Sequence, residues 1–209
     1  MRVRAETLLI AVLAIFATTG WLAIHFLEAD GEYIDDPGHV LVTPVVPDVP
    51  VTADPGPVTG SAWFQQNRGF CNPVDVVTRM RWQPAPKTDE GHMYEAACYA
   101  LAGKIDLARA SIERLPHAQR YRAAGVVFNA GHPAADAGDE LAAGPLMELV
   151  VEFWPNHYMA LYHAGAAAYE RGDSEPAHGY LTRFLEHYGV EDGWRSSALR
   201  MLEDIRRGG

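Results

Sequence analysis

Residues 161–184 read LYHAGAAAYERGDSEPAHGYLTRF, and this segment carries the clearest structural pattern in the chain. Its first half is rich in small residues, Gly172 follows, and the second half places Ala177, Leu181 and Phe184 three and four residues apart. Apolar residues at these spacings share one face of a helix, and glycine adopts the left-handed conformation that ends one. The segment therefore predicts two helices joined by a tight turn.

The same arrangement occurs twice more upstream. Gly103, Gly138 and Gly172 are 35 and 34 residues apart, and each has a small residue seven positions earlier and an alanine five positions later. This period is typical of helix–turn–helix repeats, in which small residues let the paired helices approach closely. The small residues are Ala96, Gly131 and Gly165; the alanines are Ala108, Ala143 and Ala177; the large apolar residues that follow them are Ile112, Leu115, Met147, Val150, Leu181 and Phe184. We predict three helix pairs over residues 88–190.

The pattern resembles the tetratricopeptide repeat family, whose motif combines Trp-x2-Leu-Gly-x2-Tyr, Ala-x3-Phe and Pro. Gly165, Tyr169 and Ala177 carry the resemblance in the third pair, and Tyr99 and Ala108 carry it in the first. The resemblance implies an all-α stack that binds peptides or protein surfaces through the first helix of each pair. Carried over by alignment, the partner-binding positions are Met93, Ala97, Phe128, His132, Tyr162, Tyr169 and Glu170.

The second pair departs most from the motif. Pro133 falls within its first helix and Pro145 within its second. Because proline removes a backbone donor and clashes with the preceding turn, both helices are predicted to break into shorter pieces.

Helical segments are expected on both sides of the repeats. Residues 61–87 form a pre-repeat segment, in which Asn72 is expected to cap a helix that starts at Pro73. Its predicted core comprises Trp63, Phe64, Phe70, Val74, Val77 and Trp82. Residues 191–209 form a C-terminal capping helix that begins at Asp192, with a partner-binding amphipathic helix as the alternative. Its apolar face comprises Trp194, Ala198, Met201, Leu202 and Ile205, and Leu199 falls off this face.

Residues 7–27 contain no Asp, Glu, Lys or Arg. As a helix they would span roughly 31 Å, the thickness of the hydrocarbon core of a bilayer. Arg2 and Arg4 precede the segment, acidic residues follow it, and no further Lys or Arg occurs before Arg68. The positive-inside rule then predicts a single-pass transmembrane helix, with residues 1–6 cytoplasmic and the rest exported. A cleaved signal peptide and a buried core helix are the alternatives, although the apolar run is longer than a signal peptide needs.

Residues 28–60 are punctuated by six prolines, a density that prevents helix and favours extended chain. Two interpretations remain open for this tether. It is either a spacer that lifts the exported domain off the membrane, or a strip that docks on a partner. The docking interpretation depends on an apolar run that includes Val40, Leu41, Val42, Val45 and Val46.

Composition excludes one class of function. The chain has 209 residues with 27 acidic and 17 basic side chains, a formal net charge of −10. A nucleic-acid binder needs a cationic face, so nucleic acid is not an expected partner. Apolar residues make up 48% and charged residues 21%, which is enough apolar surface for a buried core.

Cys71 and Cys98 are the only cysteines and lie 27 residues apart. Two are too few for a disulfide-built mini-protein or a four-cysteine zinc site. In an exported domain they can form a disulfide between the pre-repeat segment and the first repeat. Two buried thiols are the alternative, and no neighbouring pattern supports a nucleophilic cysteine.

No motif indicates catalysis or a cofactor. The sequence has no Gly-x-Ser-x-Gly, phosphate loop, dinucleotide fingerprint, His-Glu-x-x-His or haem attachment motif. Its nine histidines include no pair three or four residues apart in the exported part. We therefore predict no catalytic residue, no cofactor and no metal site.

These patterns together predict a non-enzymatic scaffold or accessory subunit that binds other protein subunits of a membrane complex. Arginine outnumbers lysine 15 to 2 and alanine is abundant, as in GC-rich bacteria. The expected location is thus the bacterial inner membrane, with the main domain in the periplasm. The alternative is a periplasmic enzyme or ligand-binding protein with a pocket in the helical stack.

Overall fold

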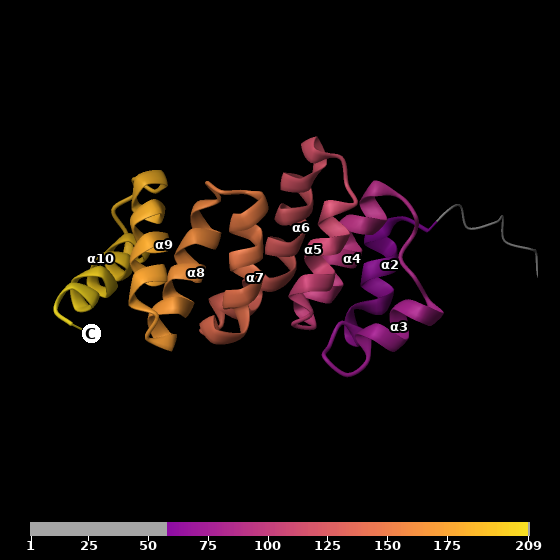
Figure 1. The fold of residues 1–209 in the computed structure, drawn as a ribbon, viewed down its shortest axis with the longest axis horizontal. Coiled ribbons are helices and arrows are strands. Elements are labelled where there is room, and N and C mark those ends of the chain that lie inside the picture. The colour runs from indigo at the N-terminus through magenta and orange to yellow at the C-terminus, as the bar shows by residue number, and fades with distance from the viewer. Residues whose placement is uncertain (1–57, 209) are drawn as a thin grey trace, which may run out of the picture. The chain divides into compact units, whose positions relative to one another are not determined.

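The computed structural model describes residues 58–208, and this part of the chain is all-α (Figure 1). The predicted span at residues 7–27 and the apolar strip at residues 40–46 lie outside it. Among residues 58–208 no strand occurs, and no helix is both long and apolar enough to cross a bilayer. The helices are α2 (Gly60–Asn67), α3 (Val76–Trp82), α4 (Asp89–Leu101), α5 (Ile105–Glu113), α6 (His117–Asp136), α7 (Glu140–Phe153), α8 (Tyr158–Arg171), α9 (Ser174–His187) and α10 (Gly193–Arg206), with a short 3-10 turn η1 (Arg68–Phe70) after α2.

Helices α4 to α9 form three successive hairpins that stand side by side in chain order (Figure 1). The predicted turn glycines are confirmed, because Gly103, Gly138 and Gly172 have φ angles of 67°, 86° and 78°. Few residues other than glycine adopt this left-handed region without strain. Each turn therefore depends on the glycine that the sequence repeats at this position.

Small residues bring the two helices of a hairpin close together. A Cβ atom added at Gly131 would lie 2.7 Å from the side chain of Leu146, and one added at Gly165 would lie 2.7 Å from that of Leu181. Ala96 is the equivalent residue of the first hairpin and is completely buried. These positions set the spacing of the helices, and the large apolar residues predicted from the repeat are all buried around them.

The prediction that proline breaks the second hairpin is wrong. Pro133 lies inside α6, and Pro145 lies inside α7. Pro133 lies close to the C-terminal end of α6. The backbone hydrogen bond that it removes is therefore followed by few others in the helix. Helix α7 buries Leu146, Met147 and other apolar residues against its neighbours, and this packing holds it continuous past Pro145.

The pre-repeat segment packs through a different face from the one predicted. Trp63 and Phe64 are buried as expected, but Phe70, Val74, Val77 and Trp82 are 40%, 84%, 40% and 81% exposed. The reason is a turn at Asn72, whose Oδ1 accepts hydrogen bonds from the N–H groups of Val74 and Asp75. Helix α3 consequently starts at Val76 rather than Pro73. Its buried residues are Val76 and Met80.

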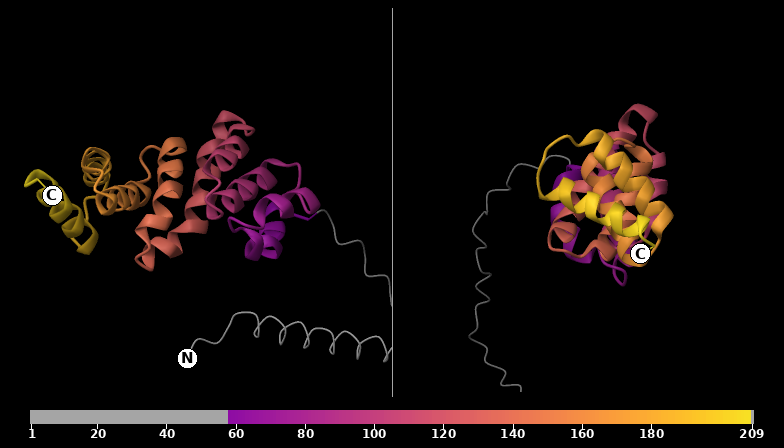
Figure 2. Two further views of the ribbon diagram at one scale, coloured as in Figure 1. Left: turned by 60° about the horizontal axis from the view of Figure 1, so that its bottom comes forward. Right: turned by 90° about the vertical axis from the view of Figure 1, so that its left-hand side faces the viewer.

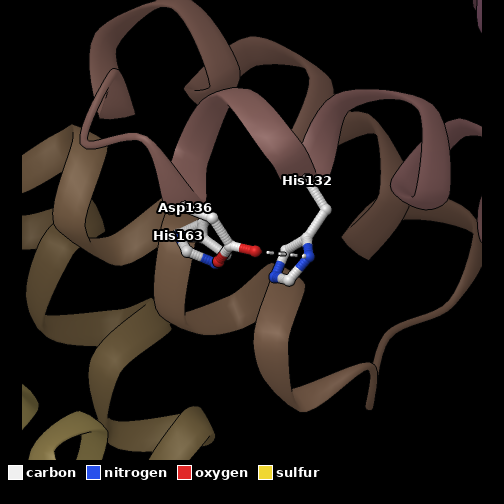
Figure 3. Close-up of side chains that lie close together, drawn as sticks. All are labelled: His132, Asp136 and His163. Carbon is white, nitrogen blue, oxygen red and sulfur yellow. Dashed lines mark ion pairs between the residues drawn. The ribbon is translucent and has the colours of Figure 1, made fainter.

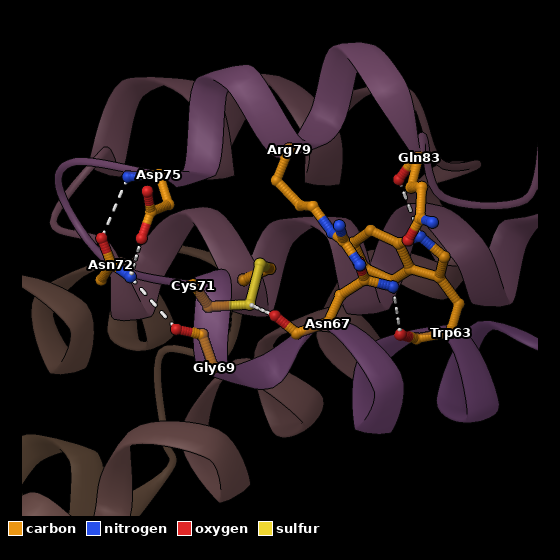
Figure 4. Close-up of a disulfide and its surroundings, with 9 residues drawn as sticks. Trp63, Asn67, Gly69, Cys71, Asn72, Asp75, Arg79 and Gln83 are labelled. Atoms are coloured by element: carbon orange, nitrogen blue, oxygen red, sulfur yellow. Dashed lines mark hydrogen bonds between the residues drawn. A yellow bond between two sulfur atoms is a disulfide. The ribbon is translucent and has the colours of Figure 1, made fainter. Parts of the chain in front are cut away.

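A disulfide between Cys71 and Cys98 joins the end of η1 to α4, with Cα atoms 4.8 Å apart (Figure 4). Beside it the buried Asn67 donates from Nδ2 to the Trp63 carbonyl at 2.8 Å and accepts from Nε of Arg79 at 2.6 Å. Covalent and polar links thus hold α2 and α3 to the first hairpin.

Helix α10 closes the C-terminal end of the described part (Figure 2). Asp192 caps it by accepting hydrogen bonds from the N–H groups of Trp194 and Arg195. The predicted apolar face is confirmed, since Ala198 is fully buried and the other four residues pack on the core, whereas Leu199 is exposed.

Candidate functional site

Aromatic and imidazole side chains form one connected set across α6, α8 and α9, which we call the ring cluster. Neighbouring ring centroids lie 4.2 to 6.2 Å apart, and the contacts close into a cycle. In order around the cycle, the members are Phe128, His132, His163, Tyr162, Phe184, Tyr188, Tyr158 and His157.

The ring cluster arises from a simple spacing rule. Phe128 and His132 are four residues apart on α6, Tyr158 and Tyr162 are four apart on α8, and Phe184 and Tyr188 are four apart at the end of α9. Side chains four apart lie one above the other on the same helix face. Three such pairs on neighbouring helices therefore meet in one place.

A groove opens beside the ring cluster, between α6 and the start of α8. It has a volume of about 420 Å³ and is lined by Gly125, Phe128, Asn129, Trp154, Asn156, His157, Tyr158 and Met159. Tyr158 is 44% exposed at its edge. A Cβ atom at Gly125 would lie 3.5 Å from the Trp154 ring, which is an ordinary van der Waals contact. We call this feature the aromatic groove.

His157 caps α8 and lies in the wall of the aromatic groove. Its Nδ1 accepts a hydrogen bond from the N–H of Ala160 at 3.3 Å. Burial lowers the pKa of His157, and the nearby His132 lowers it further, so the imidazole is neutral at neutral pH. The helix cap also requires a neutral imidazole, because a protonated Nδ1 has no lone pair with which to accept a hydrogen bond.

Stability is expected to fall as the pH drops from 7.5 to 5. The pKa of His157 is lower in the folded state, so the unfolded chain takes up the proton first and acid favours unfolding. His157→Asn keeps a capping acceptor that does not titrate, and it should flatten the pH dependence of the thermal midpoint. His157→Ala should cost about 1 kcal/mol at pH 7.5 through the lost cap. If the thermal midpoint of His157→Asn depends on pH as that of the parent chain does, other titratable groups cause the pH dependence of stability.

Figure 3 shows a histidine–carboxylate cluster. It lies next to the aromatic groove, because the His132 ring packs on Phe128 in the groove wall. His132 and Asp136 come from α6, and His163 comes from α8; their ligand-capable atoms all lie within 4.8 Å of one another. His132 Nδ1 is 3.3 Å from Asp136 Oδ2, and His163 Nδ1 is 2.9 and 3.0 Å from the two carboxylate oxygens of Glu140. The Nε2 atoms of both histidines are buried without a hydrogen-bond partner. Burial lowers the pKa of His132, which keeps its imidazole neutral near pH 7.

Three of the predicted partner-binding residues lie beside α10 and do not line the aromatic groove. Tyr162, Tyr169 and Glu170 line a cavity of about 360 Å³ whose other wall is α10. The Tyr169 hydroxyl donates to Asp204 of α10 at 3.2 Å, and this bond raises the pKa of Tyr169. Helix α10 thus covers part of the surface that the repeat pattern had marked for a partner.

The structure therefore brings some predicted residues together and separates others. Phe128, His132 and Tyr162 belong to the ring cluster, whereas Tyr169 and Glu170 face α10. Met93 is half-buried on α4 and lines neither cavity, and Ala97 is completely buried. The structure adds residues that sequence reasoning missed, namely Asp136, Glu140, Trp154, His157, Tyr158 and His163. The available signal was the spacing of His132 and Asp136, which lie four residues apart on one helix.

The described residues define a class of protein: an all-α module of helical hairpins with an aromatic groove and a histidine–carboxylate cluster beside it. Comparison of the chain with protein-family models, with curated proteins and with solved structures shows no match. Function is accordingly inferred from the residues and their geometry.

Proposed function

We propose that this chain is a non-enzymatic, membrane-anchored scaffold or accessory subunit, and that it holds a partner protein of a membrane complex on the periplasmic face. The helical hairpins supply the binding module, and residues 7–27 supply the anchor. The resemblance to tetratricopeptide repeats points to protein binding as the mode of action.

The observation that carries this proposal is the aromatic groove. Trp154, Phe128 and Tyr158 line it, and the amides of Asn129 and Asn156 supply polar groups at the same place. Aromatic anchors with polar groups around them are typical of the residues that dominate protein–protein binding energy. The volume of about 420 Å³ suits one or two apolar side chains of a partner segment.

Two further features support an exported location. The disulfide between Cys71 and Cys98 is a bond that persists in oxidising compartments such as the periplasm. The charge asymmetry around residues 7–27 favours export of everything that follows. A module tethered at the membrane also meets membrane-bound partners at a high effective concentration.

The proposal is tested by purifying the full chain in mild detergent and identifying by mass spectrometry the proteins that come with it. Tyr158→Ala should weaken recovery of the specific partner at least tenfold, as expected for an interface anchor. Leu107→Ala is the matched control, because Leu107 is 42% exposed on α5 and does not line the groove. Recovery of a bare monomer, or equal binding by both variants, would contradict the proposal. A small molecule found in native mass spectra instead would favour a ligand-binding protein.

A further inference from the structure

The cluster of His132, Asp136 and His163 has the composition of a metal site. Two imidazole nitrogens and one carboxylate oxygen suit Zn²⁺, whereas Mg²⁺ and Ca²⁺ prefer ligand sets made of oxygen alone. The 3.3 Å between His132 Nδ1 and Asp136 Oδ2 equals the edge of a tetrahedron with bonds of about 2.0–2.1 Å. These two ligands already stand at the distance that zinc requires.

His163 is held in a form that can bind a metal. Its side chain is 0% exposed, and Glu140 accepts from Nδ1 through both carboxylate oxygens. Because a carboxylate only accepts, Nδ1 carries a proton, and in the neutral imidazole Nε2 then carries the lone pair. Metal-binding histidines commonly donate their second nitrogen to a carboxylate in this way.

The lone pair on His163 Nε2 has no hydrogen-bond partner, although the atom is fully buried. A buried polar atom that is left unsatisfied destabilises the fold, so such an atom requires an explanation. His132 Nε2 is buried and unpartnered as well. With Nδ1 of His132 facing the ion, its Nε2 keeps the ring proton, so the orphaned lone pair that indicates a metal ligand is that of His163 Nε2.

The surroundings favour a cation and allow the site to close around it. Asp136 is the last residue of α6, where the carbonyl end of the helix carries partial negative charge. Its side chain is 47% exposed, so it can change rotamer without repacking the core. A movement of about 1.5 Å brings atoms 4.8 Å apart to the spacing of zinc ligands.

We propose that His132, Asp136 and His163 bind one Zn²⁺ ion, with Glu140 orienting His163 and the fourth coordination position open to water or to a partner side chain. The ion would connect α6 to α8 and so fasten the second hairpin to the third beside the aromatic groove. This inference stands on the cluster alone and does not require the proposed partner binding.

The test is zinc titration of the full chain in mild detergent after chelation, followed by calorimetry and thermal unfolding. We expect one Zn²⁺ per chain and a thermal midpoint that rises with zinc and falls again with chelator, because the ion binds only the folded chain. Asp136→Asn and His132→Gln should each weaken zinc at least tenfold. Glu140→Gln should weaken it between 10-fold and 100-fold, as expected for a residue that orients a ligand.

The matched control is His178→Gln, since His178 is an exposed histidine on α9 outside the cluster. It should leave zinc affinity and stoichiometry unchanged. Asp136 is half-exposed, so its variant should fold even where changes at the buried His163 do not. Absence of zinc binding by the parent chain would overturn the proposal, and so would zinc binding equal in Asp136→Asn, His132→Gln and the control.

Discussion

Gly91→Ala is expected to destabilise the domain by about 3 kcal/mol, which lowers the thermal midpoint by roughly 6–12 °C. A Cβ atom at this position would lie 1.9 Å from the carbonyl oxygen of Pro86 and 2.8 Å from its carbonyl carbon. Backbone atoms cannot rotate away as a side chain can, so the chain before α4 has to move. That movement also disturbs the cap of α4, in which Thr88 accepts from the Gly91 N–H.

Gly179→Ala is the matched control for this prediction. Gly179 lies inside α9, and a Cβ atom there would meet nothing within 4 Å. Alanine should therefore stabilise the domain by about 0.5–1 kcal/mol, because it costs less backbone entropy than glycine in a helix. Thermal unfolding of both variants in the same detergent gives the comparison, and two equal midpoints would refute the close approach of Pro86.

Removal of the disulfide should have an effect of similar size. Cys71 and Cys98 close a loop with a sequence separation of 27. The chain-entropy model assigns such a loop a stabilisation of about 3.5 kcal/mol. The double variant Cys71→Ala, Cys98→Ala should unfold at a correspondingly lower temperature, and the parent chain should lose a comparable amount on reduction.

The double variant also provides the internal control, since a reducing agent should not change its thermal midpoint. Thiol labelling of the native, unreduced parent chain is the independent measurement. Labelling of both cysteines under these conditions would show that no bond joins them.

The helical hairpins could be predicted because their signals are local. A glycine with positive φ and an alanine five residues later specify a turn and a close contact whatever lies around them, as Gly172 and Ala177 illustrate. The face of α10 was predictable for the same reason, because fourteen residues define the phase of an amphipathic helix clearly.

The pre-repeat segment shows where local signals fail. Helix α3 has seven residues, too few for apolar spacing alone to fix which face is buried. The hydrogen bonds of Asn72 and the nearby disulfide orient α3, and the spacing of its apolar residues indicates neither of them. The prediction that Pro145 breaks its helix failed for a related reason. Burial of α7 outweighed the loss of one backbone hydrogen bond.

The candidate site could be predicted only in part. Phe128, His132 and Tyr162 were expected at a partner surface, and all three belong to the ring cluster. The histidine–carboxylate cluster joins His132 to His163, which is 31 residues away in the chain. Only the placement of α6 next to the buried face of α8 brings these groups together, so no spacing rule within one helix predicts the pair.

The disulfide has a mechanical consequence. Tension applied to the chain ahead of residue 58 passes from Cys71 directly to Cys98 in α4. Because the disulfide bypasses the residues between the two cysteines, they do not extend under load. Without the bond they would lengthen the stretched chain by roughly 90 Å. A load on the leading end is therefore delivered covalently to the first hairpin and bypasses the backbone of α3.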